Sequence, residues 1–370
     1  MSIKSVLLPG CKSTTQRALI CAVLGEQTLV LEGVSEADDC RELRGCLSAL
    51  GAVINRQKAG HWQVVGSGKN LPIKKAELNC GTGATTLRFM LAICAMQRGL
   101  FRFKVTASLL SRPHQPLIEA LQAMGATIEP LSDGWAMDSR YVKVADIELD
   151  SSVSSQFKSA LLLAQGNDCK FAVIEKSTSV SGSYFELTKS VISDFSQSIC
   201  SYTVPGDLSA SLYFAAYSII NECSVSLENA ISLGHPEIYA LEFLHHHFAF
   251  DYSDKQFIAR ANASAVAGPL IFDVARAVDA SLVIAVLARV CEVEIKFIND
   301  QALSHKESDR KQAIVDLQTA SEVIDCRDDH RIAMAAAVLQ LHLPELQIIG
   351  HECVSKSFPD FFNQWSRLND

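Results

Sequence analysis

The sequence lacks the features that define several classes of protein. Its 12 cysteines, scattered from Cys11 to Cys353, include no CxxC pair, so we expect buried thiols rather than zinc ligands or disulfides. No apolar run approaches the roughly 20 residues that span a bilayer, and the start MSIKSVLLPG lacks the regions of a signal peptide. We therefore expect a cytoplasmic protein that does not bind a membrane.

Positive charge is also scarce. The chain has 33 Lys+Arg against 41 Asp+Glu, a net charge of −8, which removes the basic field that non-specific nucleic-acid binders use. Nucleic acid is therefore not an expected partner, and an anionic ligand would need cations gathered locally. No metal site is expected at His245, His246 and His247, because three successive side chains point in different directions.

What is present is a folded chain with an internal repeat. Its 370 residues, 48% hydrophobic and 20% charged, suit about two globular domains. An amphipathic helix, a Gly-Ala stop and a β-branched strand recur 74 residues apart, from Gly51 to Gly125. A second short strand is expected after a polar turn in each copy, near Trp62 or Trp135. Four copies are expected, two clear and two weaker, and they start at Leu43, Leu117, Phe185 and Leu241.

Three small-residue turns lead into apolar helices. PGCKSTTQR (residues 9–17) precedes a helix expected over 18–24, CGTGATTLR (80–88) precedes one over 89–96, and SSQ (154–156) precedes one over 157–163. Hydroxyl groups at a helix start cap it, and its free N–H groups attract an anion. Each turn could equally be a plain turn or cap, and the second is not a P-loop because no Gly-Lys-Ser/Thr follows.

Charged clusters follow late in the chain, KESDR at 306–310 and DDHR at 328–331. Arg331 opens an Ala-rich helix expected over 332–339, where a cation costs energy unless an anion or a carboxylate compensates it. Fixed cations at several helix starts predict one site for a multiply charged anion. The eight cations are Lys12, Arg17, Arg88, Arg112, Lys306, Arg310, Arg331 and Lys356.

In this order, PGCKSTTQR, GTGATTLR, SRP, SSQ, KESDR, DDHR and SKSFPDF resemble the motifs of the 5-enolpyruvylshikimate-3-phosphate synthase family, from Pro9 to Phe361. The resemblance implies an α/β fold of two similar domains, each of three βαβαββ repeats, the inside-out α/β barrel type of enolpyruvyl transferases. The first domain would be residues 11–204, and the second residues 1–10 with 205–370. The TVPGD run at 203–207 fits one crossing.

The resemblance also implies a reaction. The enolpyruvyl group of phosphoenolpyruvate would pass to the 5-hydroxyl of shikimate 3-phosphate, with release of phosphate, in chorismate and aromatic amino acid biosynthesis. The implied partners are these two small molecules, no metal or organic cofactor is implied, and a monomer is expected. The two substrates together carry a charge of roughly −5 to −6. The eight cations and the two acids Asp279 and Glu307 together carry a charge of +6, which would balance it.

By the same resemblance, Asp279 matches the residue that accepts the hydroxyl proton, although it could also be a helix cap. Glu307 matches the candidate proton donor, a role that a raised pKa would favour, and Lys12 touches both ligands. Shikimate 3-phosphate would be bound by Ser13, Arg17, Ser154, Ser155, Gln156, Ser181 and Lys306. The phosphoenolpyruvate side would be lined by Lys12, Ala84, Arg88, Arg112, Arg310, Arg331 and Lys356.

The sequence departs from the family pattern at a few positions. Ser108 stands where many members carry an additional Arg, and Ala302 stands where many carry an Asn that contacts shikimate 3-phosphate. Ala84 replaces a Gly that packs against phosphoenolpyruvate, so its methyl group narrows the pocket. We therefore expect weak inhibition by glyphosate, which is longer than phosphoenolpyruvate.

Two alternatives are open at this stage. An enolpyruvyl transferase acting on a UDP-linked amino sugar would usually have Lys-Asn at Lys12-Ser13 and a reactive Cys in a loop of the first domain, but no Cys occurs between Cys94 and Cys169. A non-catalytic relative that binds phosphorylated metabolites would predict loss of the catalytic residues. Asp279, Glu307 and Lys356 are all present.

Overall fold

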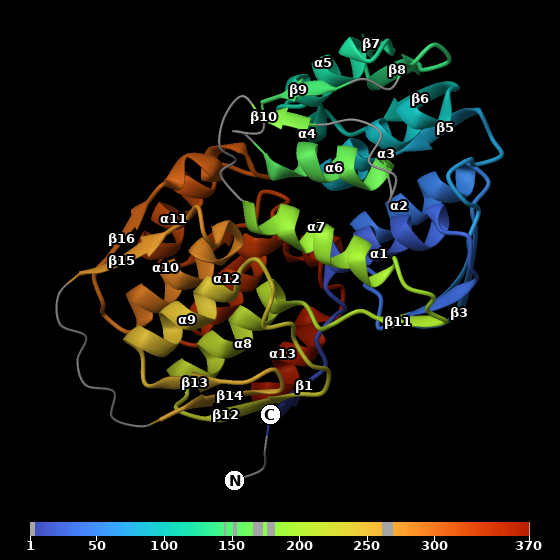
Figure 1. The fold of residues 1–370 in the computed structure, drawn as a ribbon. Helices are drawn as coiled ribbons and strands as arrows, with labels where there is room; N and C mark the ends of the chain where they lie inside the picture. Colours follow the sequence, from blue (N-terminus) through green and yellow to red (C-terminus); the bar gives the residue numbers. More distant parts are fainter. Residues whose placement is uncertain are drawn as a thin grey trace. The chain divides into compact units, whose positions relative to one another are not determined.

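A computed structural model describes residues 4–143, 146–150, 154–165, 173–175, 182–260 and 269–369. The chain forms two compact units. The first unit comprises Gly10–Val204, and the second comprises Met1–Pro9 together with Pro205–Asp370. Figure 1 colours the first unit mainly blue to green and the second mainly yellow to red.

The first unit alternates helices and strands. Its helices are α1 (Lys12–Leu24), α2 (Asp38–Ala49), α3 (Ala84–Gln97), α4 (Ala107–Leu110), α5 (Gln115–Ala123), α6 (Ser155–Gln165) and α7 (Gly182–Asp194). Its strands are β2 (Leu29–Glu32), β3 (Val53–Lys58), β4 (His61–Val65), β5 (Lys75–Asn79), β6 (Leu100–Lys104), β7 (Thr127–Leu131), β8 (Gly134–Asp138), β9 (Ile147–Leu149), β10 (Val173–Glu175) and β11 (Ser201–Thr203).

Its strands form small sheets, each built on a parallel pair. The described sheets have the strand orders β11-β2-β4-β3, β5-β6-β8-β7 and β10-β9. In the first, Leu31 of β2 pairs with Tyr202 of β11 in parallel and with Trp62 of β4 in antiparallel register. The apolar helices α1, α3 and α6 supply most of the core, and α3 packs along α6.

The second unit has the same construction. Its helices are α8 (Leu208–Ile220), α9 (Ile238–His247), α10 (Ser281–Val290), α11 (Arg310–Thr319), α12 (His330–Gln340) and α13 (Phe361–Asn369), with 3₁₀ turns η1 (Val278–Ala280), η2 (Asp300–His305) and η3 (His351–Lys356). Its strands are β1 (Lys4–Val6), β12 (Ser224–Leu227), β13 (Phe250–Tyr252), β14 (Gln256–Ala259), β15 (Leu270–Asp273), β16 (Ile295–Ile298), β17 (Val323–Asp325) and β18 (Gln347–Ile349).

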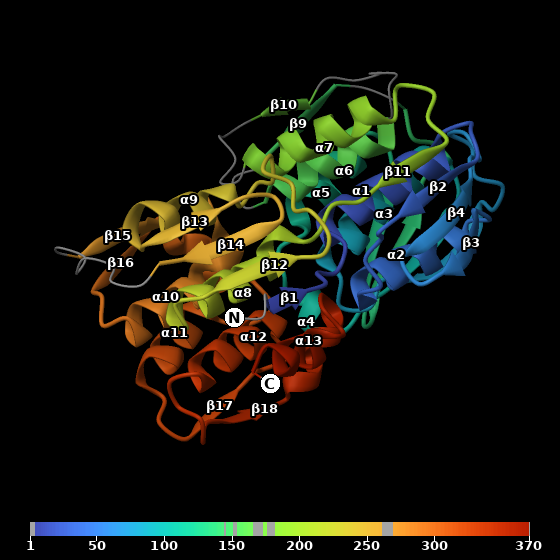
Figure 2. The same ribbon diagram turned by 90° about the horizontal axis from the view of Figure 1, so that it is seen from below.

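The sheets of the second unit differ in size. The β1-β12-β14-β13 sheet has four strands and lies along α8 and α9 (Figure 2), whereas the described parts of β15-β16 and β17-β18 are parallel pairs only. The two-stranded sheets leave apolar side chains exposed, among them Ile271 at 57% and Ile349 at 54%. The antiparallel hairpin of the repeat is therefore present in three of the six described sheets.

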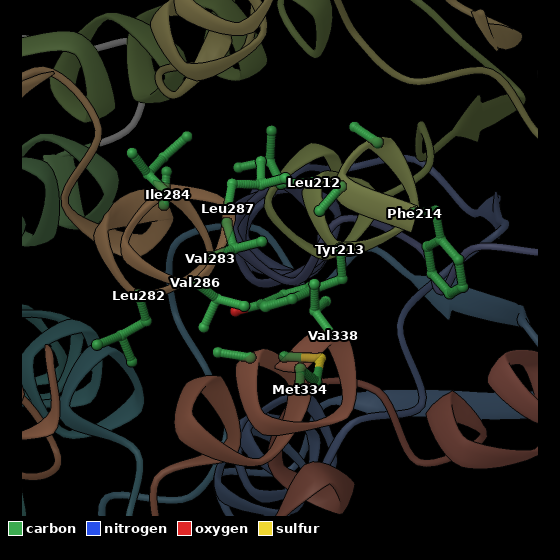
Figure 3. Packing of buried hydrophobic residues seen from close by; sticks show 14 of the residues in the cluster. Leu212, Tyr213, Phe214, Leu282, Val283, Ile284, Val286, Leu287, Met334 and Val338 are labelled. Atoms are coloured by element: carbon green, nitrogen blue, oxygen red, sulfur yellow. The ribbon is translucent and has the colours of Figure 1, made fainter. Parts of the chain in front are cut away.

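The core of the second unit lies between its three apolar helices. Figure 3 shows Tyr213 of α8 among Val283 and Val286 of α10 and Met334 and Val338 of α12. Because these helices are buried on nearly all sides, their apolar residues show no single exposed stripe. Each such buried side chain stabilises the fold by about 1.5–3 kcal/mol.

The α/β repeat is confirmed, with one correction. The copies beginning at Leu43 and Leu117 are helices α2 and α5 followed by hairpins, and Gly51 and Gly125 after them adopt φ of +92° and +97°, which favour glycine. The copy at Leu241 is α9 with the hairpin β13-β14. The copy expected from Phe185 is wrong, because α7 is followed by the single strand β11, which pairs with β2.

All the motifs except SRP and SKSFPDF lie at helix starts. In the first unit they open α1, α3 and α6, and in the second unit they precede or open α11 and α12. Within the described residues, none of the helices has both the length and the hydropathy needed to cross a membrane. The fold thus presents backbone N–H groups and motif side chains at the same ends of its helices.

Candidate active site

The start of α1 holds Lys12 beside a buried carboxylate. Lys12 is the first residue of α1, and its Nζ lies 2.8 Å from Oδ2 of Asp39 at the start of α2. The hydroxyl cap predicted for this helix is wrong, since Cys11 is the N-cap residue and makes no side-chain cap bond. Thr15 Oγ1 instead accepts a hydrogen bond from the N–H of Ser35, so it fixes the neighbouring loop.

Arg17 is buried and held from three directions. Its Nε donates to Thr188 Oγ1 at 2.8 Å, Nη1 to the Ser13 carbonyl at 2.8 Å and Nη2 to the Tyr184 carbonyl at 3.3 Å. Burial lowers the pKa of Arg17 to about 10, so it remains a cation at neutral pH. The guanidinium also lies over the ring of Phe89, which fixes its direction.

Arg88 joins the starts of α3 and α6. Its Nη1 donates to Gln156 Oε1 at 2.6 Å and to Ser154 Oγ at 3.2 Å. Its Nε donates to Nδ1 of His114 at 3.4 Å, and burial together with the Arg88 charge lowers the pKa of His114 to about 3. His114 is therefore neutral and can accept this hydrogen bond.

The other residues predicted for the first unit, where the structure describes them, lie at or next to the ends of its helices. Ala84 is the first residue of α3 and is 6% exposed, and Ser155 is the buried first residue of α6. Arg112 follows α4 and its charge acts on His114. Ser181 lies outside the described residues.

A hydrogen-bond chain ties these helix starts together. Gln16 of α1 donates to Thr86 Oγ1 of α3 at 3.1 Å, and that hydroxyl donates to the carbonyl of Asp39 in α2 at 3.1 Å. With the Arg88 bonds to α6, the starts of α1, α2, α3 and α6 meet at one end of the first unit. Residues from three separate motifs therefore belong to one largely buried hydrogen-bond network there.

In the second unit, Asp279 is the centre of a charged cluster. Its Oδ1 accepts from Nη1 of Arg310 at 2.7 Å, and its Oδ2 accepts from Nη2 of Arg331 at 3.2 Å. Lys306 Nζ lies 3.6 Å from Oδ1. Asp279 lies in η1 just before α10, and neither η1 nor α10 has a side-chain cap bond, so the helix-cap alternative is wrong.

Arg310 connects Asp279 to two further acids. It is 1% exposed, and it donates from Nη2 to Glu307 Oε2 at 2.9 Å and from Nε to Asp329 Oδ2 at 2.8 Å. Asp329 is fully buried and also caps α12 by accepting from the N–H of Arg331 at 2.9 Å. The cation at this helix start, the Arg331 guanidinium, is compensated by the carboxylate of Asp279, as the sequence required.

The cluster fixes the charges of its members. Burial by itself raises the pKa of Asp279, but the positive charges of Lys306, Arg331 and Arg310 hold it well below the usual value. Burial opposes the charge of Arg310, yet Asp329, Glu307 and Asp279 raise the pKa of Arg310 above its ordinary value. Asp279 is thus an anion that accepts hydrogen bonds from two fixed guanidinium groups.

Sequence reasoning missed Glu237, the N-cap residue of α9. It is 1% exposed, and its Oε1 accepts from the backbone N–H of Asp279 at 3.0 Å. Burial and the charge of Asp279 raise the pKa of Glu237 to about 7. The sequence HPE carries no signal for this contact, which joins residues 42 positions apart.

The remaining cation, Lys356, ends η3, which packs against α12. In the described part of the chain, no hydrogen bond or ion pair links Lys356 to the Asp279 cluster.

The described residues also contain no group of three or more His, Cys, Asp or Glu that could hold a metal, and the cysteines among them are free. His245 Nδ1 lies 2.8 Å from the carbonyl of Phe250.

The family model described as EPSP synthase (3-phosphoshikimate 1-carboxyvinyltransferase) matches residues 3–318 and 314–365. The chain belongs to the EPSP synthase family. Its activity is the transfer of enolpyruvyl from phosphoenolpyruvate to shikimate 3-phosphate, a reaction of aromatic amino acid biosynthesis.

Known members of the EPSP synthase family match along nearly the whole chain. The 3-phosphoshikimate 1-carboxyvinyltransferase of Nitrosomonas europaea is 27% identical over 413 residues, with 98% of this chain and 96% of the relative covered. That of Idiomarina loihiensis is 29% identical over 432 residues, with the same shares covered. Both alignments are longer than the 370 residues of this chain, so the relatives contain segments that it lacks.

Solved structures share the fold. An EPSP synthase of Acinetobacter baumannii superimposes with a TM-score of 0.75 at 20% identity and covers 98% of this chain and 95% of its own. The enolpyruvyl transferase NikO of Streptomyces tendae gives a TM-score of 0.70 at 13% identity, with 100% and 95% covered. The expected two-domain α/β fold of enolpyruvyl transferases is confirmed.

Proposed function

We propose that Asp279, Glu307 and Lys12 carry out the chemistry of this EPSP synthase family member. Asp279 takes the proton of the 5-hydroxyl while the oxygen bonds to C2 of phosphoenolpyruvate, and Glu307 gives a proton to the methylene carbon. The resulting tetrahedral intermediate then loses phosphate from C2, which takes the proton from Asp279, while Glu307 takes a proton back from the new methyl group and the double bond is restored. Lys12 stabilises the charge on both substrates.

The observation that supports this proposal most is the Asp279 cluster. It places a carboxylate, an acid candidate and two guanidinium groups within hydrogen-bond distance, with Arg310 contacting both Asp279 and Glu307. Nε and Nη1 of Arg331 are buried and make no hydrogen bond within the described part of the chain. Such donors suit a phosphate or carboxylate of the substrate.

We propose binding roles for the other predicted residues as well. Arg17 and Ser13 would hold shikimate 3-phosphate together with Ser154, Ser155, Gln156, Ser181 and Lys306. Phosphoenolpyruvate would be held by Lys12, Arg88, Arg112, Arg310, Arg331 and Lys356, beside Ala84. The two units would be the two domains of the family fold, and a monomer would contain every residue named.

The proposal is tested by phosphate release. We expect phosphate from phosphoenolpyruvate only when shikimate 3-phosphate is also present, and a loss of about 10²-fold or more in kcat/KM in Lys12→Ala, because a fixed charge near the reacting groups is removed. Lys75→Ala, an exposed lysine of the same unit, is the control and should act like the parent. Well-folded protein without turnover would favour the non-catalytic alternative.

Ala84 predicts how the protein responds to glyphosate. If the Ala84 methyl group narrows the pocket, a ligand longer than phosphoenolpyruvate meets an overlap that costs about 1–3 kcal/mol. Ala84→Gly should therefore tighten inhibition by glyphosate roughly ten- to a hundredfold, with a smaller change in KM for phosphoenolpyruvate. Equal, tight inhibition of both proteins would contradict the assignment of Ala84 to this pocket.

A further inference from the structure

Glu237 is a buried acid that the proposed mechanism does not use. Its carboxylate bridges two elements: Oε1 accepts from the N–H of Asp279 in η1, and Oε2 accepts from Oγ of Ser209 in α8 at 3.3 Å. Its own N–H donates to Nδ1 of His235 at 3.1 Å. The side chain therefore fixes the short turn that presents Asp279.

Glu237 and Asp279 have opposite surroundings. Asp279 has three cations within 4 Å, whereas no cation forms an ion pair with Glu237 in the part of the chain that the structure describes. Burial and Asp279 accordingly raise the pKa of Glu237 to about 7, while the pKa of Asp279 is well below its usual value. Two adjacent carboxyl groups with separated pKa values are typical of acid–base sites.

The charged and polar groups that act on Glu237 come from η1, α8, α12, the loop before α9 and the segment that follows η2. The acid beside it is Asp279 of η1, the cations that act on it are Arg331 and Lys306, and its neutral hydrogen-bond partners are Ser209 and His235. The cations surrounding Asp279 make it a weak base, because they stabilise its charged form. An anionic Glu237 counteracts them and increases the proton affinity of Asp279.

We propose that Glu237 is a positioning residue for the reaction: it holds the turn that carries Asp279, and its negative charge supports proton transfer to that residue. This inference rests on the proposed role of Asp279 as the base. Its consequence is a turnover rate that falls as Glu237 becomes protonated, so the acid limb of the kcat profile lies near neutral pH. Asp279 alone would place that limb in strongly acidic solution.

The test is the pH dependence of kcat in Glu237→Gln. The amide has the same size and its oxygen can still accept from Asp279, but it carries no charge and does not titrate. We expect kcat at pH 8 to fall roughly three- to tenfold and the acid limb near pH 7 to disappear. Glu242→Gln, on the part-exposed side of the same helix, should keep the parental profile.

A second variant and a second measurement protect the test against misfolding. Glu237→Asp keeps the charge on a shorter side chain, so its acid limb should remain although kcat falls. In urea denaturation, the parent should lose stability relative to Glu237→Gln as pH rises from 5 to 8, because a carboxyl group with a raised pKa favours the folded state only while it is protonated.

The outcomes separate the two proposals. An unchanged acid limb and rate in Glu237→Gln, with Asp279→Asn inactive, would overturn the role of Glu237 alone. If Asp279→Asn kept full turnover, the base assignment itself would fail. If Glu237→Gln and Glu237→Asp both lost the acid limb and the rate equally, the role of its charge would be contradicted and only a packing role would stand.

Discussion

Replacement of Asp279 by asparagine should lower kcat by about 10³-fold, within the range of 10²–10⁴ that a general base contributes. An amide cannot take the proton of the 5-hydroxyl at neutral pH. It also presents an NH₂ group where the carboxylate accepts from Arg310 at 2.7 Å or from Arg331 at 3.2 Å, so one guanidinium loses its partner. Under the proposed mechanism, both effects weaken the transfer of the hydroxyl proton.

Phosphate release under saturating substrates measures this loss, and thermal unfolding shows whether the variant is folded. The matched control is Asp273→Asn, six residues earlier at the end of β15. Asp273 is half-buried and accepts hydrogen bonds from the Ala275 N–H and from Asn299, so its loss disturbs the same loop without touching the cluster. A rate for Asp279→Asn within tenfold of the parent would contradict its role as the base.

Local sequence signals predicted which segments form helices, although α1 begins six residues and α3 five residues before the expected starts at 18 and 89. The pattern of a small or hydroxyl residue followed by an apolar run depends only on local structure. The backbone N–H groups of a helix's first turn lack partners within the helix, so small or hydroxyl residues are favoured there, next to the buried apolar part. The motifs at α1, α3, α6 and α12 accordingly lie at helix starts, but their residues form the first turns of the helices instead of preceding them. The cap partners themselves were harder to predict, since Thr15 bonds to the loop at Ser35 rather than to its own helix.

The charge balance of the site could not be predicted from motifs. The sequence count of eight cations against two catalytic acids leaves a surplus of positive charge. That count omits two further acids, Asp39, which pairs with Lys12, and Glu237, which lies against Asp279. These acids come from helix starts that carry no recognisable motif, and they reach the site only through packing of separate repeats. Long-range contacts of this kind depend on the tertiary fold, so a local pattern has no means of indicating them.

The hairpin expected after Phe185 failed for a related reason. A helix followed by a β-branched strand is common to all repeats, but the second strand of a hairpin needs a turn and a further apolar segment. After Thr203 the chain instead reaches Pro205, which begins the second unit. Strand β11 is therefore completed by β2, 171 residues earlier in the chain.

The same cluster predicts a large effect on stability at Asp329. Asp329 is fully buried and accepts four hydrogen bonds, two from Arg310, one from Ser308 and one from the N–H of Arg331. Asp329→Ala removes the cap of α12 and a carboxylate partner of a guanidinium that is 1% exposed. Breaking a buried ion pair from one side costs about 3–5 kcal/mol, so the free energy of unfolding should fall by that amount.

Two substitutions separate this ion-pair effect from the loss of a helix cap. Asp309 caps α11 by accepting from the N–H groups of Lys311 and Gln312 but is exposed, so Asp309→Ala should cost only about 1 kcal/mol. Asp329→Asn keeps an acceptor for the cap but loses the charge, and it should fall between the two alanine variants. Urea denaturation of the three proteins gives the order, and an equal loss in Asp329→Ala and Asp309→Ala would show that the buried carboxylate acts as a cap alone.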